Sequence, residues 1–163
     1  MDITDLDPTL EGQFDFIISS DVFEHVAPPI SMAFENVRKL LKPDGVLIFS
    51  VPYSKNQETV EHFPGLHSYR IVEAEGHYTL RNITRDGVLQ IFENPVFHGG
   101  AGSTLEMRVF SESSLLEELN QAGFDKVNIY KAPDFDYGIY WDVDWSLPMS
   151  VRLSEAPFLR SPS

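Results

Sequence analysis

Two carboxylates and an imidazole stand in one short turn, at Asp21, Glu24 and His25. Side chains of these types transfer protons or coordinate a divalent cation such as Mg²⁺ or Zn²⁺. Because imidazole titrates near neutral pH, His25 is suited to accept a proton from a nucleophile. A histidine that only caps the turn or packs against its neighbours has the same sequence signature, so the spacing leaves these roles open.

The segment before this turn is a continuous apolar run, residues 14–19, typical of a parallel strand buried on both faces. Residues 28–42 have apolar side chains at helical spacing and predict a helix with its two prolines in the first turn. The Pro-Asp-Gly of residues 43–45 should then turn the chain into a second strand over residues 46–51. This β-α-β unit places residues 19–21 at the carboxyl edge of a parallel sheet, where such folds bind ligands.

The rest of the chain predicts a mixed continuation of the sheet. Residues 54–64 are polar and without periodicity, which indicates a mobile loop that could serve as a lid. Residues 69–92 alternate around Asp86-Gly87, a strong hairpin signal. Ser111 is placed to cap a helix that Gly123 ends. Two further strands are expected, over residues 124–130 and 147–153.

Composition excludes several classes of partner. The chain has 163 residues, no cysteine and a net charge of −13, with 12 Lys and Arg against 25 Asp and Glu. Nucleic acids and anionic membranes attract basic proteins, so neither is expected as a partner. No apolar run approaches the ~20 residues that span a bilayer, and the acidic start of the chain is unlike a signal peptide. We therefore expect a cytoplasmic protein without disulfides.

The two strand segments and their turns resemble the S-adenosylmethionine-dependent methyltransferases of the Rossmann-like class, type 11 or ubiquinone-pathway-like. The resemblance rests on residues 14–26, with the Asp-x-x-Glu-His turn, on residues 41–52, with the Leu-x-Pro-x-Gly turn, and on the segment 110–124. It implies an α/β fold, a partial Rossmann-like methyltransferase sheet holding the family's strands in the order 4-5-7-6. The partial domain would span residues 1–153, with an antiparallel hairpin insertion at about 69–94 and a disordered tail at 154–163.

The resemblance also implies a binding site for S-adenosylmethionine. In the family, the residue pair after the third strand binds the adenine, and Asp2 and Ile3 occupy that place here. The backbone at Ser19 and Ser20 would face the methionine part of the cofactor, and Val22 would pack near the adenine.

The catalytic candidates follow from the same resemblance, and the substrate-binding candidates from a glycine-rich loop that is not a general feature of the family. The Asp21 to His25 turn is similar to the Glu-x-x-Glu-His turn with which ubiquinone-pathway O-methyltransferases and small-RNA 2'-O-methyltransferases hold a divalent metal. Many members with this Glu-His pair need no metal, so we expect none and take His25 and Asp21 as the catalytic candidates. The glycine-rich loop at 98–102 should place His98 and Arg108 over the cleft as substrate-binding residues. The aromatic and acidic run 134–145 either clasps a polar substrate or covers the end of the sheet.

A family member also carries a Gly-x-Gly loop and a strand ending in an acid ahead of its fourth strand. Neither precedes Phe14 here. The first expectation is therefore a truncated methyltransferase of a small molecule, with weak or absent cofactor binding and no activity as an isolated chain. The bare strand 14–18 favours self-association, most simply as a homodimer. The alternative is a non-catalytic dimerisation or binding module that retains the back half of the methyltransferase fold.

Overall fold

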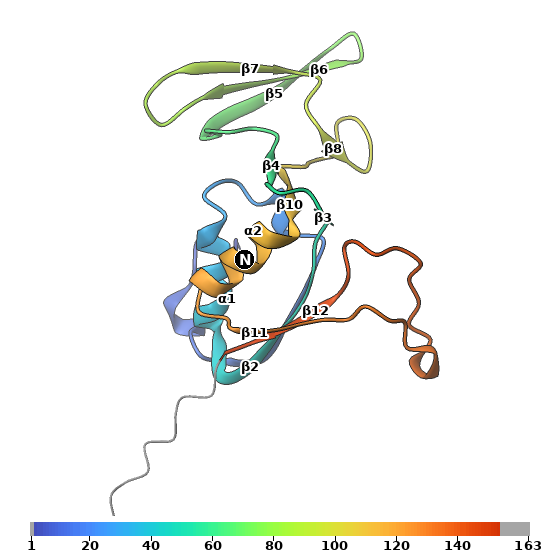
Figure 1. Ribbon diagram of the computed structural model, residues 1–163. Helices are drawn as coiled ribbons and strands as arrows, with labels where there is room; N and C mark the ends of the chain where they lie inside the picture. The colour runs from blue at the N-terminus through green and yellow to red at the C-terminus, as the bar shows by residue number, and fades with distance from the viewer. Residues whose placement is uncertain (1, 154–163) are drawn as a thin grey trace, which may run out of the picture.

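The structure is a computed structural model and describes residues 2–153 (Figure 1). The expected disordered tail, 154–163, lies outside the described residues. No helix in the described range is long and apolar enough to cross a membrane. The larger elements are β1 (Phe14–Ser20), α1 (Ser31–Leu40), β2 (Leu41–Ser50), β5 (Ser68–Ala74), β6 (His77–Ile83), β7 (Leu89–Glu93), α2 (Glu112–Gln121), β11 (Lys126–Ile129) and β12 (Met149–Arg152). The shorter ones are η1 (Pro8–Leu10), η2 (Phe23–His25), β3 (Tyr53–Ser54), β4 (Val60–Glu61), β8 (Phe97–His98), β9 (Thr104–Leu105), β10 (Arg108–Ser111) and η3 (Phe135–Tyr137).

A four-stranded sheet forms the base of the molecule, in the order β1-β2-β12-β11. β1 and β2 are parallel, with Ile17 opposite Leu47 and Ser20 opposite Ser50. β12 runs antiparallel to both of its neighbours. The predicted parallel pair and the predicted order 4-5-7-6 are therefore both confirmed, and β1 lies at the edge of the sheet.

The two helices α1 and α2 cover the same face of this sheet (Figure 1). Their apolar sides close one core with the inward residues of β2 and β12: Ala33, Phe34, Val37, Leu47, Phe49, Val51, Leu115, Leu119, Met149 and Val151. On the opposite face Phe16 is 58% exposed and Ile18 65% exposed, and the neighbouring Ile48 is exposed as well. The described residues thus cover only one face of the sheet. The apolar area left bare on the other face is centred on β1.

The start and end of α1 differ from the prediction. The helix begins at Ser31, so the two prolines precede it instead of filling its first turn. Pro28 stands before Pro29, and a residue before proline is disfavoured in the helical region. The helix ends at Leu40 instead of Lys42, and Leu41 is already extended. Lys42 also precedes a proline, and Pro43 to Gly45 form an irregularity within β2 instead of a turn before it.

The second helix forms as its sequence predicts. The Ser111 side chain accepts a hydrogen bond from the Ser114 N–H at 3.0 Å, and Gly123 follows the helix with a φ of +94°. Such a φ favours glycine, because it has no Cβ to clash. Leu115 and Leu119 face the core, so this stripe fixes α2 against the sheet.

The insertion is larger than a hairpin. β6 and β7 form the expected pair around Asp86-Gly87, and β5 adds a third antiparallel strand along β6. This three-stranded sheet stands apart from the four-stranded one (Figure 1). It has a small core of its own, made of Phe63, Leu66, Leu80, Leu105 and Met107.

The predicted loop at 54–64 contains ordered pairing. β3 lies parallel to β10, and β4 lies antiparallel to it, with Glu61 opposite Arg108. This segment therefore ties the insertion to the start of α2 through two short strands, which the prediction of a mobile loop over residues 54–64 did not include.

Candidate functional site

The carboxyl ends of β1 and β2 meet through polar contacts. The hydroxyls of Ser20 and Ser50 are 2.8 Å apart, and the Asp21 N–H donates to the Ser50 carbonyl at 3.0 Å. Asp21 has a φ of +51°, an uncommon conformation for a non-glycine residue, and its carboxylate accepts from the Ser20 hydroxyl at 3.4 Å. Val22 beside it is 45% exposed. This edge therefore offers the hydroxyls of Ser20 and Ser50, the carboxylate of Asp21 and the accessible apolar side chain of Val22.

Asp2 and Ile3 lie in an ordered turn. The Asp2 carboxylate accepts from the N–H and the hydroxyl of Thr4, which lowers the pKa of Asp2. The Ile3 side chain packs against the main core, and its carbonyl accepts from the Asn36 side chain on α1 at 2.8 Å. The turn is thereby anchored to α1.

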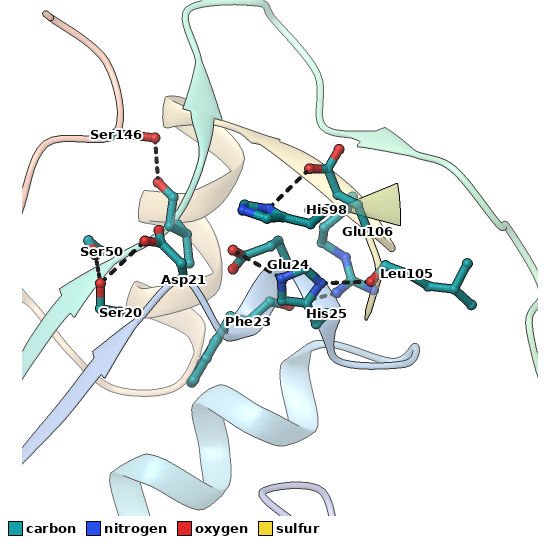
Figure 2. Close-up of polar contacts among 12 residues, drawn as sticks. Ser20, Asp21, Phe23, Glu24, His25, Ser50, His98, Leu105, Glu106 and Ser146 are labelled. Carbon is teal, nitrogen blue, oxygen red and sulfur yellow. Dashed lines mark hydrogen bonds and ion pairs between the residues drawn. The ribbon is translucent and has the colours of Figure 1, made fainter. Parts of the chain in front are cut away.

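The η2 turn holds Glu24 and His25 in different environments. Glu24 is fully buried, and neither of its carboxylate oxygens accepts a hydrogen bond from another residue within residues 2–153. Burial raises the pKa of the Glu24 carboxyl, since a buried charge loses its hydration. His25 Nδ1 lies 2.7 Å from the Leu105 carbonyl, so in the neutral ring Nδ1 carries the hydrogen and Nε2 is free. That Nε2 lies 3.5 Å from the nearer Glu24 oxygen (Figure 2).

A second histidine reaches this turn from β8. The His98 ring stands edge-on to the His25 ring, with the ring centres 5.3 Å apart. Its Nδ1 is 3.8 Å from one oxygen of Glu106, and the other Glu106 oxygen is 3.2 Å from His62 Nε2. Figure 2 shows His98 directed toward Glu24 and His25, with Glu106 behind it. The structure therefore brings His98 to His25 but keeps Asp21 apart, beside Ser20.

Arg108 is fully buried behind the turn. Its Nη1 donates to the carbonyls of Phe23 and Val26 at 3.0 and 2.7 Å, and its Nε donates to Glu61 at 2.7 Å. The guanidinium thus holds both ends of η2 and joins it to β4. Because Arg108 has no exposed surface and donates to the turn, it is suited to position Glu24 and His25. The sequence predicted instead that Arg108 lies over the cleft and binds the substrate.

A hollow of about 420 Å³ opens just past the carboxyl end of β2. The Ser146 hydroxyl fixes its rim by donating to the Val51 carbonyl and accepting from the Tyr53 N–H. Lys55 pairs with Asp144 across the opening, and Trp145 is half exposed. The lining residues are Pro52, Tyr53, Ser54, Lys55, Val109, Asp144 and Trp145.

Several residues of this region were not identified from the sequence. The contacts of Ser50 with Ser20 and of Leu105 with His25 join residues that are 30 and 80 positions apart in the sequence. Glu106 comes into the region because β8 pairs with β9 just before it. No local motif marks a backbone carbonyl such as that of Leu105. His62 had a weak signal, as a histidine in a polar segment.

Comparison with known proteins gives a family and a fold. A family model described as a methyltransferase domain matches residues 2–129. No curated protein matched the sequence. Among solved structures, a methyltransferase dependent on S-adenosylmethionine from Mesorhizobium loti is 17% identical with a TM-score of 0.52, covering 93% of this chain and 67% of that one. A sugar N-methyltransferase from a Streptoalloteichus species is also 17% identical, with a TM-score of 0.50 and coverages of 94% and 61%.

A glycopeptide N-methyltransferase complexed with S-adenosylmethionine has a similar likeness, at 18% identity and a TM-score of 0.50, covering 95% of this chain and 59% of that one. The chain spans between 48% and 63% of the length of the first three solved structures that it matches.

Proposed function

The chain belongs to the methyltransferase-domain family, within the Rossmann-like class that depends on S-adenosylmethionine, and we propose that it forms the back half of a catalytic site that methylates a small molecule. The observation that carries this proposal is the paired carboxyl edge of β1 and β2, at Ser20 and Ser50. Open α/β sheets bind their ligands at this edge.

The cofactor would lie along the segment Ser19 to Val22. Ser20 and Asp21 are held by β2, which fixes the backbone that would face the methionine part of the cofactor. The exposed Val22 side chain would pack near the adenine, and the anchored Asp2-Ile3 turn would bind its edge. S-adenosylmethionine supplies an electrophilic methyl group on a sulfonium, so the protein's task is mainly to align the nucleophile with it.

Asp21 is the better placed of the two catalytic candidates. Its carboxylate is exposed at the edge, next to the Ser20 hydroxyl, where it can accept the proton that a hydroxyl or amine loses on methylation. The free Nε2 of His25 faces the buried Glu24 instead. We therefore assign proton transfer to Asp21 and a positioning role to Arg108 behind the turn.

The substrate would occupy the hollow beside Trp145. It opens next to the carboxyl end of β2, and it combines an aromatic surface with the charged pair Lys55 and Asp144. Such a lining suits a small polar molecule that presents an apolar face. The structural neighbours include a sugar N-methyltransferase and a glycopeptide N-methyltransferase. His98 does not line this hollow; it lies against the His25 ring on the insertion side of the turn.

We expect the chain as given to bind S-adenosylhomocysteine no more tightly than about 100 μM. In the family, a glycine-rich loop and an acid that binds the ribose provide several of the cofactor's hydrogen bonds. The segment before Phe14 has only Gly12 and no such loop. Each hydrogen bond to a charged group contributes ~1.5–3 kcal/mol, so their loss moves a micromolar site toward millimolar. Titration calorimetry measures this, and a low-micromolar constant would contradict the incomplete site.

The bare face of β1 supports the second candidate function, a dimerisation or binding module. Phe16, Ile18 and Ile48 form an exposed apolar area on β2 and on β1, the edge strand of the sheet. Such edges are templates for pairing with another chain. A homodimer built through this face would cover it whether or not the chain is catalytic.

A further inference from the structure

The outer face of the three-stranded sheet combines exposed apolar and basic side chains. Strand pairing places two rows of residues side by side on this face, each crossing β5, β6 and β7. The first row is Arg70, Arg81 and Ile91, and the second is Ser68, Ile83 and Leu89. The three apolar members are between 49% and 61% exposed. The other face of the sheet carries Leu80 and packs on the small core, so the described residues leave the outer face uncovered (Figure 1).

Arg70 and Arg81 lie directly opposite each other without an acidic partner. Neither guanidinium forms a hydrogen bond or an ion pair within residues 2–153. Like charges directly opposite on a sheet are unfavourable. The chain has 25 Asp and Glu against 12 Lys and Arg, yet the nearest acid on this face by register, Glu93, is one row away and pairs with neither arginine. Two unpaired guanidiniums in an acidic protein indicate an anion from outside the described chain.

A second hollow of about 420 Å³ lies over these two rows, and Tyr69 completes its lining. Its volume lies within the range of small-molecule sites, about 300–1,000 Å³. Protein interfaces of standard size involve about 20–30 residues on each side, many more than the seven that line this hollow. The size therefore favours a small molecule over a protein as the occupant.

We propose that this face binds an aliphatic carboxylate, whose anionic head lies between Arg70 and Arg81. Its chain lies over the apolar members of the two rows, Ile83, Leu89 and Ile91. A guanidinium presents paired N–H donors that match the two oxygens of a carboxylate. The chain removes exposed apolar surface from water, which is favourable. The site is separate from the carboxyl edge of β1, and the inference does not depend on the proposed methyl transfer.

The test is titration calorimetry of the chain with octanoate, and with octanol and propionate as probes that carry the chain alone and the charge alone. We expect one octanoate per chain with a Kd below about 1 mM, and binding of octanol and of propionate at least about tenfold weaker. Arg70→Gln and Arg81→Gln should each weaken octanoate binding at least about tenfold, because each removes a charged donor. Both side chains are exposed, so both variants should fold.

The matched control is Arg85→Gln, which removes the same charge from the exposed turn between β6 and β7, outside the hollow. It should leave the octanoate affinity unchanged. Amide chemical shifts locate the ligand: octanoate should shift signals of β5 to β7 and leave those of β1, the other bare apolar strand, in place.

Three results would each overturn the proposal. They are octanol binding as tightly as octanoate, full octanoate affinity in Arg81→Gln, and octanoate-induced shifts confined to β1. Octyl phosphate binding more than about tenfold tighter than octanoate would overturn the assignment of a carboxylate head. All of these results are independent of cofactor binding and of methyl transfer.

Discussion

Replacing Arg108 by methionine should lower the free energy of unfolding by about 3–5 kcal/mol, because two backbone carbonyls each lose a hydrogen bond from a charged donor that contributes ~1.5–3 kcal/mol. Methionine fills much of the space but donates no hydrogen bond. The carbonyls of Phe23 and Val26 would then lose their guanidinium donor, and Glu61 would lose its cation. The η2 turn depends on these contacts, so the effect should be among the largest of any single substitution in the chain.

Urea-induced unfolding measures this difference, with Arg70→Met as the matched control. Arg70 is exposed on β5, and its replacement should change the stability by less than about 0.5 kcal/mol. A loss for Arg108→Met as small as that of the control would contradict the positioning role. It would mean that the turn is held by other contacts.

Lysine substitutions at Ile17 and Ile18 should have opposite consequences. Ile17 packs against the main core beneath the helices, so Ile17→Lys should destabilise the fold by several kcal/mol and aggregate the protein. Ile18 is 65% exposed on the bare face, so Ile18→Lys should preserve the fold and dissociate the homodimer that we propose for this face.

Sedimentation and light scattering over a range of concentrations distinguish the two variants. The original chain should show a mass that rises toward the dimer, and the Ile18→Lys chain a constant monomer mass. A concentration-independent monomer for the original chain would rule out association through β1. A dimer that survives Ile18→Lys would assign the interface to another surface.

The strand segments were predictable because their signals agree at each level. Residues 14–19 and 46–51 are continuous apolar runs, which predict buried strands. The resemblance to the methyltransferases then supplied the order in which these two strands and the strand at 147–153 lie in the sheet. The same continuity concealed which face is bare. Since Phe16, Ile17 and Ile18 are all apolar, only the register against β2 shows that Ile17 faces the helices and Ile18 does not.

The site was predictable only where it is local. The Asp21 to His25 turn and the edge at Ser20 could be identified from their spacing. His98 was noted because of its glycine-rich loop, but its approach to His25 depends on how β8-β9 docks against η2. Arg108 was misplaced because an arginine near a loop resembles a ligand-binding residue, and burial with backbone carbonyls as acceptors leaves no mark in a sequence.

The carboxyl edge of β1 is the cofactor site that we propose, and amide chemical shifts in solution test this most directly. We expect millimolar S-adenosylhomocysteine, added to the isotope-labelled chain, to shift the amide signals of Ser19 to Val22 and of Ile3. The signals of β5 to β7 should not move, because these strands stand apart from the edge (Figure 1). Unchanged signals at Ser19 to Val22, or shifts confined to the three-stranded sheet, would contradict the account.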